Sequence, residues 1–149
     1  MKKTVVIFGA VIIFSLGLSL VRWCFHFPGT RYICMFESAE SGKVCIESRH
    51  LPKDSVRDDV HRYVDELLLG PLAPEFRPLF TRGTKALSCF VRDDVLYVNL
   101  SDELIWQDDG VSDIARGIEL FRKNILHNFN NIHTIDVFVA GNQTHSVAK

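Results

Sequence analysis

The sequence predicts an α+β fold, a two-layer sandwich in which two helices pack on a mixed sheet of about five strands. Three observations lead to this fold class. Two short segments alternate apolar and polar side chains with the period of half-buried strands. Two longer segments repeat apolar side chains every three or four residues, as one face of a helix does. An uncharged apolar segment precedes both and predicts a transmembrane helix.

The N-terminal segment from Thr4 to Val21 carries no charged side chain, and two lysines precede it. A helix of about 20 apolar residues spans a bilayer, and lysines before it favour a cytoplasmic N-terminus. We therefore predict that residues 1–24 anchor the protein in the cell membrane as a single-pass helix, with the rest outside the cytoplasm. A cleaved signal peptide would need small residues after the segment, and lipid attachment at Cys24 is a third interpretation.

The domain would follow a linker at residues 25–30, span residues 31–142 and end in a polar tail at 143–149. We expect two strands first, at residues 31–37 and 43–48, with Pro52 interrupting the pattern because proline is rare inside paired strands. A helix capped by Asp54 or Ser55 would then run to Gly70-Pro71, where glycine and proline favour a stop. The interval from Leu72 to Gly83 predicts a long loop.

The central hairpin is predicted at residues 86–101, where two alternating segments flank Arg92-Asp93-Asp94. Six side chains would form its apolar face: Leu87, Cys89, Val91, Leu96, Val98 and Leu100. A short helical turn at residues 101–106, a second helix from Ser112 and a last strand at residues 134–140 would complete the domain. Ile135, Val137 and Val139 share one face of that strand.

Two cysteines flank the turn-like segment Ser38–Gly42. If that turn closes a hairpin, Cys34 comes opposite Cys45, and an oxidising compartment would permit a disulfide between them. The alternative is that both are small apolar strand residues.

Four residues are candidates for contact with a partner or ligand. Glu47 and Arg49 lie two residues apart, so they share one side of a strand and predict either an ion pair or a polar contact to a partner. Phe76 and Phe80 lie in the predicted loop, where aromatic side chains could hold a glycan.

Composition argues against several functions. The 17 basic and 18 acidic residues nearly balance, so no basic footprint for nucleic acid is present. No serine lies in a nucleophile-elbow sequence, and the histidines lack metal-site spacing. We predict no enzymatic activity, no cofactor and no metal.

Short motifs along the domain resemble the GerMN domain family of sporulation and germination proteins. They occur in the family's order: Glu47-Ser-Arg49, Leu51-Pro52, Leu67–Pro71, Arg82-Gly-Thr84, Val95–Ser101 and Ile135–Gly141. Two departures are Thr81, where the family usually has proline, and Lys123–Leu126, where it commonly has Asn-Thr. The resemblance implies a membrane-attached extracytoplasmic domain, related to the ring-building folds of secretion and sporulation complexes, without enzymatic activity.

Two functions follow as hypotheses. The first is a scaffold or assembly protein of the cell envelope, whose partners are other envelope proteins or further copies of itself. The second is a module that binds a cell-wall glycan such as peptidoglycan, or another small polar ligand.

Overall fold

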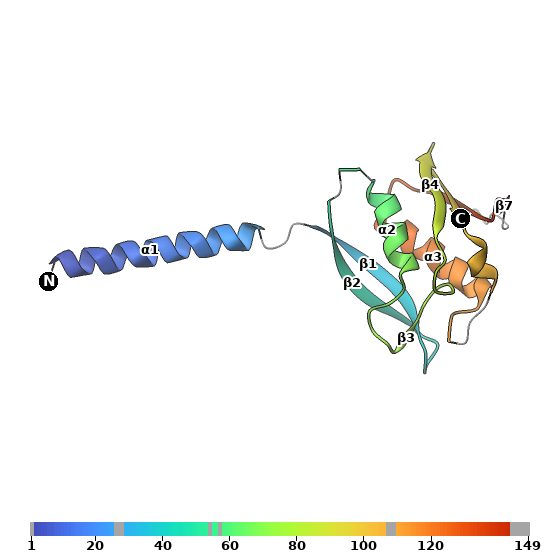
Figure 1. Ribbon diagram of the computed structural model, residues 1–149, viewed down its shortest axis with the longest axis horizontal. Coiled ribbons are helices and arrows are strands. Elements are labelled where there is room, and N and C mark those ends of the chain that lie inside the picture. The colour runs from blue at the N-terminus through green and yellow to red at the C-terminus, as the bar shows by residue number, and fades with distance from the viewer. Residues whose placement is uncertain (1, 26–28, 54, 57, 107–109, 144–149) are drawn as a thin grey trace.

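Two β-sheets and two helices form the domain in the computed structural model, and a further helix precedes it (Figure 1). The structure describes residues 2–25, 29–53, 55–56, 58–106 and 110–143. The elements in chain order are α1 (Lys2–Phe25), β1 (Gly29–Ser38), β2 (Val44–Pro52), α2 (Asp59–Leu68), β3 (Phe76–Arg77), β4 (Ala86–Arg92), β5 (Val95–Leu100), the 3₁₀ turn η1 (Asp102–Ile105), α3 (Ile114–Asn128), β6 (Thr134–Val139) and β7 (Asn142–Gln143).

The strands form two sheets, so the α+β class is confirmed but the prediction of one mixed sheet is wrong. One sheet has the order β2-β1-β3 and the other has the order β4-β5-β6-β7. In the second sheet β5 pairs with β4 antiparallel and with β6 parallel. The first sheet cannot extend toward α3, because two asparagine side chains of α3 occupy that edge of β1 at Ile33 and Met35.

The central hairpin, β4–β5, is confirmed. Asp93 and Asp94 both have positive φ, 49° and 63°, which is the backbone of a two-residue turn whose twist matches the strands. The β5 face is fully buried as predicted, through Leu96, Val98 and Leu100. On β4 the prediction fails at Leu87, which is 59 % exposed, because the register shifts between Ala86 and Ser88 and turns Leu87 outward.

The hairpin β1–β2 has a different register from the predicted one. Ser38 N–H donates to Lys43 O, so Gly42, with φ of 64°, belongs to the turn. Glu37 pairs with Val44, and β2 then continues through Pro52. The strand ends at this proline, where an interruption was predicted, but it extends beyond the predicted end at residue 48. Pro52 can still pair with Gly29 because β2 is an edge strand, where a missing N–H leaves no partner unpaired.

Helix α2 begins later than predicted. Asp58 caps it by accepting from His61 N–H at 2.6 Å, whereas Asp54, one predicted cap, lies outside the described residues. Gly70, with φ of 87°, follows the end of α2 as expected. Helix α3 begins near Ser112 as predicted, and a Cβ at Gly117 would come 2.2 Å from Leu79 O, so the loop before β4 packs directly on the helix backbone.

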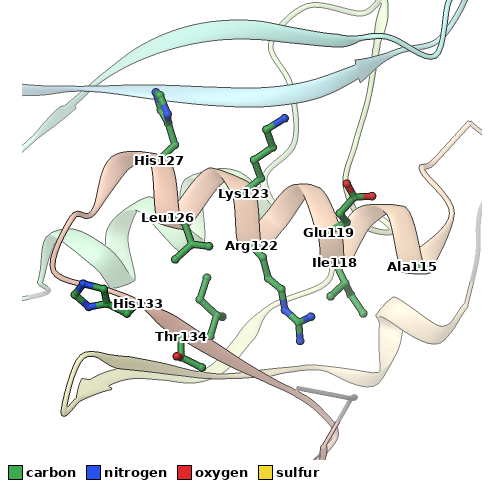
Figure 2. Close-up of a pocket in the computed structure, with 10 residues that line it drawn as sticks. Ala115, Ile118, Glu119, Arg122, Lys123, Leu126, His127, His133 and Thr134 are labelled. Atoms are coloured by element: carbon green, nitrogen blue, oxygen red, sulfur yellow. The ribbon is translucent and has the colours of Figure 1, made fainter. Parts of the chain in front are cut away.

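Helices α2 and α3 lie between the two sheets and share a single core with both (Figures 1 and 2). The β6 face predicted to be apolar, Ile135, Val137 and Val139, belongs to this core. Tyr32 of β1, Tyr63 of α2 and Phe129 after α3 pack with ring centroids 5.2–5.7 Å apart. The two sheets are therefore held together through the helices.

Helix α1 covers the predicted anchor segment and extends away from the domain (Figure 1). Within the described part of the chain, no helix meets the length and apolarity that crossing a membrane requires. The predicted transmembrane helix therefore lacks support from the structure. Linker residues 26–28 and tail residues 144–149 lie outside the described residues, and the predicted domain boundaries stay predictions.

Candidate functional site

Arg49, one of the four candidate contact residues, lies buried between β2 and the end of α2. Its side chain is 5 % exposed. Nε donates to Glu47 Oε1 at 2.7 Å, Nη1 to Glu66 Oε1 at 2.7 Å and Nη2 to Gly70 O at 2.7 Å. The guanidinium also lies 5.7 Å from the ring centroid of Phe36.

The pKa of Arg49 reflects this environment. Burial alone disfavours the charged guanidinium, but the hydrogen bond to Glu47 and the nearby acidic groups outweigh burial and raise the pKa above its ordinary value. Glu47 is itself held by the backbone, since its Oε2 accepts from Leu72 N–H at 3.1 Å. The ion-pair interpretation is confirmed, and the pair fixes the turn after α2. A contact to a partner at these residues stays a prediction.

Phe76 and Phe80 do not lie in an unstructured loop. Phe76 begins β3 and packs against the core half-buried. Phe80 is 4 % exposed and its ring lies 5.8 Å from that of Phe121. The structure therefore places both aromatic side chains in or against the core, and a ligand role for them is untested.

The two candidate disulfide cysteines are not opposite each other. Cys34 pairs with Glu47, Cys45 pairs with Phe36, and both thiols are free. The predicted pairing is wrong because the turn between them lies one residue further along the chain. Burial raises the pKa of the Cys34 thiol, so it behaves as a small apolar core residue.

A network of polar side chains lies in the core between α3, α2 and β1, and the sequence analysis did not predict it. Asn124 Oδ1 accepts from Met35 N–H at 2.7 Å and its Nδ2 donates to Met35 O at 2.9 Å. Asn128, one helical turn later, makes the same pair of bonds to Ile33 at 2.9 and 2.7 Å. Tyr63 Oη donates to Ile33 O at 2.6 Å. Two side-chain amides on α3 thus take the place of a neighbouring strand along β1. The sequence contains one indication of this network, because the two asparagines are spaced i, i+4 on an otherwise apolar face of the helix.

A groove lies between α3 and the start of β6, and we call it the α3–β6 groove (Figure 2). Its volume is about 630 Å³. Its lining residues are Ala115, Ile118, Glu119, Arg122, Lys123, Leu126, His127, His133, Thr134 and Ile135. Ile118, Leu126 and Arg122 point from α3 toward β6 (Figure 2). Lys123 and His127 point to the opposite side of the helix, toward the strands of the first sheet (Figure 2).

A second surface lies on the outer face of the sheet β4-β5-β6-β7. Phe90 of β4 is 50 % exposed and stacks on Tyr97 of β5, with ring centroids 5.3 Å apart and planes at 18°. Phe138 of β6 and Asn99 line the same shallow depression. An exposed aromatic ring can stack on a sugar ring, and a polar side chain next to it can hydrogen-bond to the hydroxyl groups of the sugar.

Among the described residues, no group of three or more histidine, cysteine, aspartate or glutamate side chains is placed to hold a metal ion. The fold thus defines the class of the protein, an α+β domain of two sheets with two helices between them.

Comparison with known proteins then identifies the family. The family described as "Germane: Sporulation and spore germination" matches residues 36–144, and the chain belongs to this family. The resemblance to GerMN domains is therefore confirmed. The chain is 26 % identical over 125 residues to a Treponema pallidum (strain Nichols) protein described as "Uncharacterized lipoprotein", covering 84 % of this chain and 87 % of that protein.

Solved structures show the same fold. The first GerMN domain of the sporulation protein GerM from Bacillus subtilis is similar with a TM-score of 0.62 and 16 % identity, over 77 % of this chain and 86 % of that one. The tandem GerMN domains of the same protein give the same TM-score and identity, over 77 % of this chain and 40 % of that one.

Proposed function

We propose that this protein is a non-enzymatic assembly protein of the cell envelope, with its domain on the extracytoplasmic side of the membrane. The α3–β6 groove is the observation that carries the proposal, because an open recess with an apolar floor and a charged rim suits a segment of another protein. Family membership supports it, since the GerMN type is not a known enzyme family. We propose sporulation or germination as the process in which the protein takes part, because the family's description names both.

Attachment to the membrane is part of the proposal. The similar protein from Treponema pallidum is described as a lipoprotein, which supports a lipid anchor at the N-terminal segment. A lipid anchor keeps the domain at the membrane surface and restricts its search for partners to that surface.

Fractionation of native cells tests this location. We expect the protein in the membrane fraction after a carbonate wash, because neither salt nor high pH releases a lipid anchor from the bilayer. Protease added outside the membrane should digest the domain. An unlipidated protein in the soluble cytoplasmic fraction would contradict the proposal.

The stacked pair of Phe90 and Tyr97 favours a second candidate function, a module that binds cell-wall glycan. Stacking on an aromatic side chain is worth about 1 kcal/mol beyond the buried area, so Tyr97→Ala should weaken glycan binding roughly five- to tenfold. Saturable binding of peptidoglycan fragments that depends on Tyr97 would support this second function. Binding that is absent, or equal in the variant, would leave the assembly function alone.

A further inference from the structure

Strand β4 forms one edge of the sheet β4-β5-β6-β7, and no described strand pairs with its other side. Arg92 pairs with Val95 across the two-residue turn, so the backbone groups of Arg92 bond to β5. Because such groups alternate between the two sides of a strand, the N–H and C=O of Cys89 and Val91 point away from β5. The edge therefore presents four backbone groups to which a further strand can bond.

The middle of β4 lacks the features that commonly protect a sheet edge. Edge strands are usually interrupted by charged side chains, proline or a bulge. Residues 86–91 contain no charged residue and no proline, and the register shift affects only the start of the strand. Cys89 and Val91 pack against the core yet are only half-buried, whereas Val98 of β5 is fully buried. This edge of the core is therefore partly open to solvent.

The two ends of the β4 edge carry opposite charges. Exposed Arg82 and Lys85 precede the strand, and exposed Asp93 and Asp94 follow it at the tip of the hairpin. The contact between Asp93 and Arg92 at 3.5 Å is fully on the surface and contributes little. An antiparallel strand from a second copy would place its acidic tip at the basic end of the first copy, and the reverse. A second copy thus complements the charge of this edge at both ends.

The basic end of the edge is accessible although α2 packs beside β4. A recess of about 560 Å³ separates α2 from the start of β4, and both Arg82 and Lys85 line it. Asp65 also lines this recess, and its carboxylate lies 3.9 Å from His61 Nε2 one turn earlier in α2. The recess therefore leaves room for the tip of a second hairpin beside the two basic side chains.

We propose that two copies of this chain associate through β4, with their strands paired antiparallel about a two-fold axis at Phe90. Cys89 of each copy then pairs with Val91 of the other, which adds four backbone hydrogen bonds and joins two four-stranded sheets into one. The two Phe90 rings come opposite each other on the outer face, and their stacks with Tyr97 form one aromatic surface. This inference goes beyond the proposed function, because it does not involve the α3–β6 groove.

Amide hydrogen exchange measured by NMR tests the proposal on the full chain. Neutral detergent micelles are kept in excess over the protein, because α1 exposes apolar side chains. Pairing of two edge strands buries less than the roughly 1,200 Å² of a stable interface, so we expect a Kd of roughly 10–100 µM. Exchange at Cys89 and Val91 should slow at least threefold as the concentration rises from about 10 to 500 µM, since pairing protects both amides.

The amide of Ile46 is the control for this measurement. Ile46 lies at the edge of β2 and pairs with Met35, whose own N–H and C=O bond to Asn124 on the side away from β2. The amide of Ile46 therefore also points away from its neighbouring strand. Its exchange rate should not depend on the protein concentration.

Matched proline variants separate β4 from every other surface. Val91→Pro removes an N–H from the β4 edge and leaves the hydrogen bonds to β5 in place, whereas Ile46→Pro makes the same change at the edge of β2. In sedimentation equilibrium with density-matched detergent, Val91→Pro should raise the Kd at least tenfold and Ile46→Pro should change it less than twofold. Phe90→Glu, which places two carboxylates opposite each other, should also raise the Kd at least tenfold. Circular dichroism establishes that each variant is folded.

A charge variant tests the complementarity of the two ends. Arg82→Glu should raise the Kd at least threefold, because it faces the acidic tip of the other copy. Arg82 is preferred to Lys85, which already has Glu103 as an acidic neighbour. Lys43→Glu, at an exposed position in the β1–β2 turn, should change the Kd less than twofold.

Three results would overturn the proposal: a chain that stays monomeric up to about 500 µM, exchange at Cys89 and Val91 that is independent of concentration, or association that is equally strong in Val91→Pro and Phe90→Glu. The last result would assign the association to another surface such as α1. None of these measurements involves the α3–β6 groove or the compartment of the protein. Failure here is therefore distinguishable from failure of the proposed function, which fractionation tests.

Discussion

Replacing Asn124 with leucine tests the polar network that joins α3 to β1. The side chain is fully buried and makes hydrogen bonds to Met35 N, Met35 O, Leu120 O and Tyr63 Oη at 2.7, 2.9, 3.0 and 3.1 Å. Leucine keeps a similar volume and a good helix propensity. The substitution therefore removes the hydrogen bonds with little change in packing.

The expected loss of stability in Asn124→Leu follows from the backbone groups of Met35 that the substitution leaves without a hydrogen-bond partner. Met35 is 6 % exposed, so water cannot replace the asparagine amide at its N–H and C=O. Each buried polar group left without a partner costs about 1–3 kcal/mol. Two such groups give a loss of roughly 4 kcal/mol, which is a large share of the 5–15 kcal/mol that stabilises a typical domain.

Urea denaturation followed by circular dichroism measures this loss on the domain from Gly29 onward. Lys123→Leu is the matched control, because it makes a comparable change at the neighbouring exposed position of α3 and should alter the free energy of unfolding by less than about 0.5 kcal/mol. The midpoint should fall at unchanged m-value in Asn124→Leu. A difference below about 1 kcal/mol between the two variants would refute the network as a stabilising feature.

Four other outcomes are expected. The domain without residues 1–24 should fold on its own, since its core cluster contains no residue of α1; a disordered circular dichroism spectrum would contradict this. Val98→Asp should lower the free energy of unfolding by several kcal/mol, because the side chain is fully buried. An equal loss for Tyr97→Asp in urea denaturation would show that the buried face of β5 is assigned wrongly. Arg49→Met should cost about 3–5 kcal/mol by leaving buried acceptors unpaired, measured by thermal denaturation; a loss within 0.5 kcal/mol of zero would contradict the network's role. Burial raises the pKa of Cys89 to about 12 from 9.0. The unfolded thiol therefore ionises first, and stability should fall as pH rises from 9 toward 12; Cys89→Ala should show a smaller fall, and an unchanged one would argue against the shift.

The elements with strong local patterns were predictable from the sequence. The hairpin β4–β5, the helix α3 and the strand β6 follow from hydrophobic periodicity, and Gly70-Pro71 correctly ended α2. Each of these depends on contacts close in the chain or on a single buried face. The exposure of Leu87 was not predictable, because a register shift has no periodic pattern of its own.

The division into two sheets depends on contacts between distant segments. Asn124 and Asn128 hydrogen-bond to residues of β1 that lie 89 and 95 positions earlier in the chain. Their i, i+4 spacing on an apolar helical face indicates a buried polar contact, but it does not identify the strand to which they bond. The groove has the same origin, since it forms only when α3 and β6 pack. The sequence correctly predicted an ion pair between Glu47 and Arg49. It wrongly placed Phe80 in a binding loop, because the prolines around Phe80 indicate a loop and no local pattern indicates that its ring packs against Phe121.

Site-specific photo-crosslinking in native cells tests the central claim, that this domain assembles with other envelope proteins through the α3–β6 groove. A photoreactive amino acid is placed at Lys123 in the groove, and in a matched strain at Ile46, an exposed strand residue of the other sheet. We expect a discrete adduct with an envelope protein, or with a second copy of this chain, at Lys123 and a much weaker one at Ile46. Equal adducts at both positions, or none at Lys123 in cells that contain the protein in their membranes, would contradict the account.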